Sequence, residues 1–196
     1  MIECINLNNE TKIYKLKYDF FIYGKDVLLN RAYQSIKLNK PHPTDRNNFF
    51  YVGFRCEEFD YLNEFILNGC EVISNNRVSE WAIQNWIYKM DTSNNNEIYH
   101  THIDLIEGDN RIQTDWTFCL YLQIPKNING DDGKISFKTN DGNEYMFLPE
   151  EGDVYIFPAD LLHTPKLIKN CEVDRIVYAG NISLNPLKKI NDISII

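Results

Sequence analysis

Two histidines and an aspartate stand at every second position within the stretch 97–107, EIYHTHIDLIE. Side chains two positions apart share one face of a β-strand, so His100, His102 and Asp104 would form a polar row. Unpaired polar groups are costly to bury, which argues against an ordinary core strand. Two imidazoles and a carboxylate on one side suit a divalent metal ion whose other side stays open.

A further histidine occurs in the segment 152–165, GDVYIFPADLLHTP. The run reads as a strand that turns at Pro158 and then presents His163. An antiparallel barrel can bring this residue opposite the first stretch, across the barrel mouth. We therefore expect His163 to complete a metal site with residues of the first stretch. The fourth histidine, His42, lies in the Pro-rich stretch 40–48 and is expected in a surface loop.

Arg175 begins another strand-like run, RIVYAG. An arginine at the start of a buried strand needs a partner, and the guanidinium fork suits a carboxylate. One candidate partner is an acidic residue of the chain: Glu172, Asp174 or another. The other is the distal carboxylate of a small dicarboxylic acid bound near the metal.

The elements around these residues change character along the chain. Helical spacing of apolar residues predicts helices over 26–38, 56–69 and 79–90. In these helices Gly69 would stand just past the second, Ser79 would cap the third, and Trp86 would pack in the core. From 97 to 184, short strands alternate with polar turns, including a hairpin signal at 141–142. We expect an α+β, mainly β single domain, with a support region at 1–96, a jelly-roll barrel at 97–184 and a tail at 185–196.

Composition narrows the function classes. The 196 residues carry a net charge of −8, which disfavours nucleic-acid binding because phosphate contacts need clustered Lys and Arg. The sequence has no apolar run long enough to span a membrane and no signal peptide, so a cytoplasmic location in the producing or host cell is expected. Five scattered cysteines without a CxxC pair argue against a disulfide scaffold or a zinc ribbon. Richness in Asn, Ile and Lys is typical of AT-rich coding sequences, such as those of some phages and viruses.

Taken in order, these motifs resemble the Fe(II)/2-oxoglutarate-dependent dioxygenase superfamily, most closely its prolyl-4-hydroxylase-like branch. His102 and Asp104 match the HxD motif, His163 the distal histidine and Arg175 the arginine that binds the cosubstrate's far carboxylate. Similar segments cover 110–111, 117–122, 132–137 and 152–158. The chain departs from the pattern at His100, a third imidazole that would be an alternative ligand if the register slips. It also departs at Asp132, where the branch often has a second glycine.

The resemblance implies a double-stranded β-helix with N-terminal helices packed on it. It implies Fe(II) bound by His102, Asp104 and His163, and 2-oxoglutarate bound by Arg175 with Tyr121. It further implies O2 as the oxidant and hydroxylation of a C–H bond, in a peptidyl, prolyl-type residue or in a small molecule. It does not predict an oligomeric state.

Two other interpretations fit part of the sequence. His100, His102, Glu107 and His163 resemble the ligands of a cupin, which often needs no 2-oxoglutarate. Glu107 lies five residues from His102, however, so it would need a bulge to reach the same face. A cupin would also give Arg175 no task. A non-catalytic jelly-roll module is the third interpretation, and it leaves the histidine and aspartate pattern unexplained.

Overall fold

A computed structural model of the chain describes residues 1–38, 49–52, 55–75, 80–94, 97–107 and 110–184. Within these ranges the side chains of 49, 51, 104–107, 110 and 111 are not described. His42, Ser79, the tail at 185–196 and the side chains of Asp104 and Glu107 therefore lie outside the described residues, and the expectations for them stay predictions.

A seven-stranded antiparallel sheet forms the larger layer. Its strands, in spatial order, are β1 (Ile2–Asn6), β2 (Lys12–Lys17), β10 (Asp153–Pro158), β7 (Trp116–Gln123), β12 (Arg175–Leu184), β4 (Trp81–Met90) and β3 (Phe49–Tyr51). Strands far apart in the sequence thus become neighbours, and β12 lies in the middle between β7 and β4.

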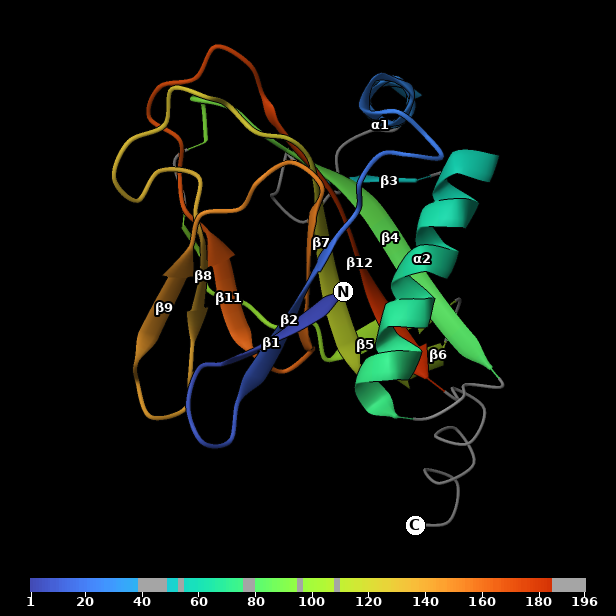
Figure 1. Cartoon of the computed structure of the whole chain (residues 1–196), viewed down its shortest axis with the longest axis vertical. Helices are drawn as coiled ribbons and strands as arrows, with labels where there is room; N and C mark the ends of the chain where they lie inside the picture. Colours follow the sequence, from blue (N-terminus) through green and yellow to red (C-terminus); the bar gives the residue numbers. More distant parts are fainter. Residues whose placement is uncertain (39–48, 53–54, 76–79, 95–96, 108–109, 185–196) are drawn as a thin grey trace.

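A smaller sheet faces the larger one. It contains β11 (Leu162–Pro165), β8 (Ile135–Lys138) and β9 (Glu144–Phe147), and a separate pair joins β5 (Asp104–Glu107) to β6 (Asn110–Gln113). Figure 1 shows β8, β9 and β11 side by side, away from the two helices. All strand pairs are antiparallel. The predicted double-stranded β-helix of mainly β class is confirmed.

Two helices, α1 (Lys25–Leu38) and α2 (Glu57–Ser74), pack on the larger sheet on the side away from the smaller one (Figure 1). The predicted helix at 26–38 is confirmed. Ala32 is buried on its inner side, whereas Val27 is 43% exposed.

The second helix continues past its expected end. Gly69 lies inside α2, which ends only at Asn75 in a left-handed conformation with φ 50°. A side chain at 69 would meet Leu16 of β2 at 2.8 Å. Gly69 therefore allows the helix to approach the sheet closely and does not end the helix.

The prediction of a helix at 79–90 is wrong, because Trp81–Met90 is strand β4. All ten residues pair with β12, from Trp81 opposite Leu184 to Met90 opposite Arg175. The segment is rich in aromatic and β-branched residues, which suit a strand, and the pairing overrides the helix-like spacing. As a result Trp86 faces the interior between the sheets, whereas Trp81 is 47% exposed.

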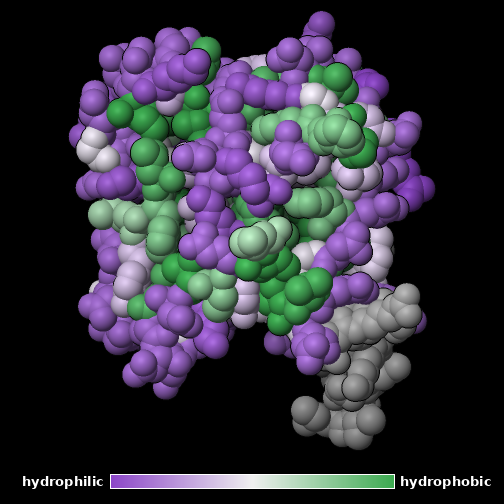
Figure 2. All heavy atoms as spheres, in the orientation of Figure 1, coloured by the Kyte–Doolittle hydropathy of each residue, from purple (hydrophilic) through white to green (hydrophobic). Residues whose placement is uncertain are grey.

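The larger sheet separates two hydrophobic clusters. The first fills the space beneath the helices, and the second fills the space between the two sheets. Side chains alternate between the two faces of β7, so Phe118, Leu120 and Leu122 point toward the helices. Thr117, Cys119 and Tyr121 of the same strand point toward the smaller sheet. Figure 2 shows apolar atoms toward the middle of one face of the molecule, with hydrophilic atoms around them.

Two glycine turns place the strands near the site. Gly152 has φ +84°, and a Cβ there would lie 2.3 Å from the carbonyl oxygen of Tyr18. Its carbonyl accepts a 2.7 Å hydrogen bond from the Tyr18 amide, which joins β10 to β2. The expected hairpin at 141–142 is also confirmed, since β8 and β9 pair and the chain turns at Gly142 with φ +85°. Among the described residues, no helix is both long and apolar enough to cross a membrane.

Candidate metal and cosubstrate site

Three histidines meet between the two sheets. His163 lies in β11 and is 4% exposed. The amide of His100 donates to the His163 carbonyl at 3.1 Å, and the His163 amide donates to the His100 carbonyl at 3.1 Å. The amide of His102 donates to the carbonyl of Ala159 at 2.8 Å. The expected meeting of these segments across the barrel is confirmed, although the stretch 97–107, read as a strand, is regular only from Asp104.

The three imidazole rings face one another closely. Ring centroids are 4.4 Å apart for His100 and His163, 4.8 Å for His100 and His102, and 5.1 Å for His102 and His163. One ring nitrogen from each residue lies within 4.8 Å of the other two. Two imidazole nitrogens on one divalent ion lie about 3–4 Å apart, since each bond is about 2.1 Å long. The cluster therefore fits a metal ion after small side-chain adjustments.

Hydrogen bonds orient two of the rings in the same way. The Nδ1 atom of His100 lies 3.0 Å from the carbonyl oxygen of Ile98, and Nδ1 of His163 lies 3.0 Å from that of Leu161. A carbonyl oxygen only accepts hydrogen bonds, so Nδ1 carries the proton in each ring. In the neutral rings Nε2 then bears the lone pair, and this is the nitrogen that can coordinate a metal.

Aromatic side chains enclose the cluster. The Phe157 ring meets His163 edge-on at 4.6 Å, and Phe137 lies 6.4 Å from it. The Trp86 ring lies 5.3 Å from His102. Such an apolar shell limits access of water and strengthens the interactions of any charge inside it.

The carboxylate of the expected triad is placed only by its backbone. Asp104 begins β5 two residues after His102 and pairs with Gln113 of β6. Its side chain and that of Glu107 lie outside the described residues. The choice between the HxD ligand set and the cupin ligand set therefore stays a prediction.

Arg175 lies in the same pocket as the histidines. Its side chain is 1% exposed, and Nη1 donates a 2.9 Å hydrogen bond to the carbonyl of Gly133. Its Nε is buried and makes no hydrogen bond. The guanidinium carbon lies 5.7 Å from the centre of the Tyr88 ring. A buried guanidinium with an unused donor is costly, which favours a site prepared for an anion.

The acidic neighbours suggested as partners of Arg175 bind elsewhere. Asp174 pairs with Lys89 at 3.3 Å, and Glu172 accepts the amide of Lys126 at 2.7 Å. In the part of the chain that the structure describes, no carboxylate forms an ion pair with Arg175. That interpretation of Arg175 is therefore wrong for the described residues.

The pocket that joins these groups lies on the inner face of β4, β7 and β12. Tyr121, expected near the cosubstrate, lines it and is 2% exposed. Burial raises the pKa of Tyr121 well above its usual value and that of the Cys119 thiol to about 12. Both groups stay protonated at neutral pH in the metal-free protein, so Tyr121 can donate a hydrogen bond. Among the described residues, Cys119 does not belong to the histidine cluster. The complete lining is Trp86, Tyr88, His100, His102, Thr117, Cys119, Tyr121, Ile135, His163, Pro165, Arg175, Val177 and Ala179.

Sequence reasoning missed Trp86 and Tyr88 as pocket residues. They were assigned to a helix, whereas β4 places them beside Ala179 and Val177 of β12. The alternation of a ten-residue strand with several aromatic residues was the signal that could have found them.

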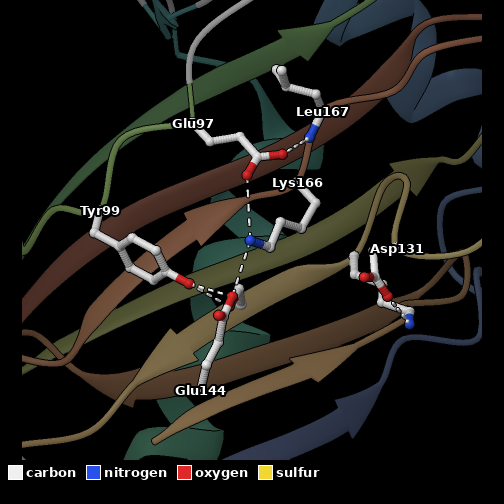
Figure 3. A network of polar contacts seen from close by, with 8 residues as sticks. Glu97, Tyr99, Asp131, Glu144, Lys166 and Leu167 are labelled. Atoms are coloured by element: carbon white, nitrogen blue, oxygen red, sulfur yellow. Dashed lines mark hydrogen bonds and ion pairs between the residues drawn. The ribbon is translucent and has the colours of Figure 1, made fainter. Parts of the chain in front are cut away.

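A polar network fastens the segment before the histidines to the smaller sheet (Figure 3). Lys166 contacts Glu97 at 3.3 Å and Glu144 at 3.0 Å, and the Tyr99 hydroxyl donates to Glu144 at 2.6 Å. Glu97 also accepts the amide of Leu167 at 2.9 Å. These contacts are made by the residues on either side of the bridge between His100 and His163, so they position both rings.

Glu144 is the most connected member of this network. Hydrogen bonds from Ser136, Tyr99 and Lys166 lower its pKa to about 2. It therefore remains ionised throughout the neutral range. All five cysteines of the chain are unpaired, as expected, and none takes part in the network.

No protein-family model matches the sequence, and no curated protein matches it. Solved structures do. The viral collagen prolyl hydroxylase of Paramecium Bursaria Chlorella virus-1, in its 2-oxoglutarate complex, superimposes with a TM-score of 0.60 at 17% identity. The match covers 90% of this chain and 98% of that one.

Two further structures agree. A prolyl-4-hydroxylase of Pseudomonas putida has a TM-score of 0.55 at 14% identity, covering 87% of this chain and 92% of that one. SnoK, a non-haem α-ketoglutarate-dependent carbocyclase of nogalamycin biosynthesis, has a TM-score of 0.65 at 10% identity, covering 90% and 84%. The chain thus has the double-stranded β-helix fold found in structures of Fe(II)/2-oxoglutarate oxygenases, prolyl hydroxylases among them.

Proposed function

We propose that the protein is an Fe(II)- and 2-oxoglutarate-dependent dioxygenase that hydroxylates a C–H bond. His102, Asp104 and His163 bind the iron, and Arg175 with Tyr121 binds the far carboxylate of 2-oxoglutarate. O2 is the oxidant. The histidine cluster suits the iron because it offers imidazole nitrogens, and the Arg175 guanidinium suits the carboxylate because it is a buried positive charge.

One observation carries the proposal. The imidazole cluster and a buried guanidinium with an unpartnered Nε line the same pocket. In this pocket a dicarboxylic 2-oxo acid would have its keto-acid end at the metal and its other carboxylate at Arg175. A cluster that only bound a structural metal would give the guanidinium no role.

Bound iron supplies the activation of O2 and of the 2-oxo acid. The residues of the chain supply binding and orientation. Arg175 and Tyr121 set the direction of the cosubstrate, and the carbonyls of Ile98 and Leu161 keep Nε2 of His100 and His163 directed to the cluster. The aromatic rings of Trp86, Phe137 and Phe157 exclude water from it.

The substrate is a peptidyl residue of prolyl type. Two of the structures with this fold are prolyl hydroxylases, which supports this choice at the level of fold. Incubation with proline-containing peptides should then add one oxygen atom to the peptide and form equimolar succinate. Succinate that forms at the same rate with and without every peptide would refute the peptidyl substrate, and small molecules would be tested next.

The deciding experiment is anaerobic titration of the purified protein with Fe(II) and 2-oxoglutarate. We expect a weak visible metal-to-ligand charge-transfer band that needs both additions and weakens in Arg175→Ala at limiting 2-oxoglutarate. Iron-dependent turnover should be abolished in His102→Ala and in His163→Ala. Near-normal turnover in either variant would refute the ligand assignment.

A cupin-type metal protein that does not use 2-oxoglutarate is the second candidate, because His100 joins the cluster as a third imidazole. It predicts tight metal binding without the charge-transfer band. Absence of metal binding would leave only the non-catalytic jelly-roll module.

A further inference from the structure

His100 has no task in the proposed triad, yet its ring lies nearer to His163 than the ring of His102 does. The centroid distances are 4.4 Å for His100 to His163 and 5.1 Å for His102 to His163. A ring that merely filled space beside the site would need no such convergence of nitrogen atoms, which all lie within 4.8 Å of one another.

The backbone holds His100 and His163 directly opposite each other. The two residues exchange both of their amide-to-carbonyl hydrogen bonds, each 3.1 Å long. In an antiparallel pair of this kind the two side chains leave the backbone on the same side. Both imidazoles therefore enter the pocket from one edge, one from β11 and one from the segment before β5.

Both rings have the same tautomer for the same reason. Each Nδ1 donates to the carbonyl two residues earlier in the chain, Ile98 for His100 and Leu161 for His163. This hydrogen bond to a backbone carbonyl is the usual outer contact of a histidine that binds a metal through Nε2. His100 is thus prepared for coordination in the same way as His163.

The segment that carries His100 is also anchored on its outer side. Figure 3 shows the Lys166 amine between the carboxylates of Glu97 and Glu144, with the Tyr99 hydroxyl directed at Glu144. Tyr99 immediately precedes His100. The network holds the backbone of His100 against the smaller sheet independently of any metal.

We infer that His100 is a third imidazole ligand of the metal while no 2-oxo acid is bound. Its release when the cosubstrate binds rests on the proposed function. An octahedral ion has six positions, of which 2-oxoglutarate takes two and O2 one, so three remain for the protein. Four protein ligands and 2-oxoglutarate would fill all six positions, so one protein ligand has to leave before O2 can bind. That ligand is His100, which lies outside the HxD pair, and 2-oxoglutarate takes its position together with one held by water.

The test counts imidazoles directly. In Co(II)-substituted protein, the Nδ1 proton of each coordinated imidazole gives a strongly shifted, exchangeable proton NMR signal. Without 2-oxoglutarate, three such signals should appear in H2O and disappear in D2O. His100→Gln should leave two and lower Co(II) affinity at least about tenfold, because even the loss of an outer contact of a ligand typically lowers it 10- to 100-fold. The matched control Thr101→Ala, at the adjacent exposed residue, should keep three.

Addition of 2-oxoglutarate should reduce the wild-type count from three to two, and His100→Gln should then resemble wild type. Two signals in the wild-type protein without 2-oxoglutarate would overturn the inference, and this count needs no variant to fold. Three signals that persist beside the charge-transfer band of the Fe(II) protein would overturn the displacement. Two signals without 2-oxoglutarate, together with the charge-transfer band, would overturn the role of His100 and leave the proposed function intact. Three signals without the charge-transfer band would support His100 as a ligand and overturn the proposed function.

Discussion

Tyr178 and Arg175 are buried polar residues three positions apart on β12, and they face opposite sides of the larger sheet. Tyr178 points toward the helices, where its hydroxyl donates a 2.6 Å hydrogen bond to Asn63 of α2. Arg175 points into the pocket, where Nη1 has the Gly133 carbonyl and Nε has no hydrogen-bond partner. The two side chains are equally inaccessible, at 0% and 1% exposure.

The difference reflects what each face does. On the helix side, apolar packing dominates, and the buried hydroxyl of Tyr178 is paired within the chain, as stability requires. On the pocket side, the same strands carry a guanidinium whose bonding is incomplete, at a cost in stability. Such a cost is expected where a site is arranged for a ligand, which supports the proposed binding role of the inner, pocket-side face. The outer, helix-side face is packed for stability.

The largest effect should be a loss of stability caused by a substitution on the outer, helix-side face of the larger sheet. Phe118 is fully buried beneath the helices. Phe118→Ala should lower the free energy of unfolding by about 3–5 kcal/mol, because a large cavity remains in a packed core. Chemical denaturation of the metal-free protein measures this loss. A loss under about 1 kcal/mol would show that the outer face is not the main source of stability.

Arg175→Met should produce the opposite pattern. The methionine retains much of the apolar stem and removes a buried charge, so the free energy of unfolding should change by less than about 1 kcal/mol. Affinity for 2-oxoglutarate should fall by about 2–4 kcal/mol, at least about 30-fold, because the ligand carboxylate loses its partner. Isothermal titration of the Fe(II) protein under argon measures the affinity, with Lys89→Met on the same sheet as the control. An unchanged affinity would assign Arg175 to structure.

A matched pair of tyrosine variants sharpens the comparison. Tyr178→Phe removes the hydrogen bond to Asn63 and should lower the free energy of unfolding by about 1 kcal/mol. Tyr121→Phe, on the pocket side, should leave stability within about 0.5 kcal/mol and weaken 2-oxoglutarate binding instead. Chemical denaturation measures the stability of both variants, and titration with 2-oxoglutarate measures their affinity for the cosubstrate. Equal losses of stability would contradict the division between the two faces.

The smallest effect concerns Glu144, on the outer side of the smaller sheet. Its pKa is lowered to about 2 in the folded protein by Ser136, Tyr99 and Lys166. A lowered folded pKa adds stability above the unfolded value, and this contribution disappears as the pH falls from about 4.5 toward about 2. The difference in unfolding free energy between wild type and Glu144→Gln should therefore shrink over this interval.

The measurements use metal-free protein, so that metal binding does not contribute to the pH dependence. A parallel series on Asp131→Asn distinguishes the effect of Glu144 from that of another acidic residue. The contribution is small because the Glu144 side chain is 40% exposed, where solvent screens charge pairs. A difference that stays constant from about pH 6 to about pH 2 would refute the network as the cause.

The sequence alone determined the components of the site. His100, His102, His163 and Arg175 were identified from residue type and spacing, and the structure brings all four to one pocket. The fold class and the helices near 26–38 and 56–69 were also predictable, since alternation and helical spacing are local properties. These features depend on neighbours within a few residues, which the sequence displays directly.

Only the tertiary structure decided the rest. It made 81–90 a central strand, because pairing with β12 along ten residues outweighs a spacing that also fits a helix. It placed Gly69 inside α2 by bringing β2 against it, and it left Arg175 without the acidic partner that its neighbours seemed to offer. It also placed His100 directly opposite His163, 63 positions further along the chain. Each of these outcomes depends on contacts between distant segments, and no local pattern records which distant segment will become the neighbour.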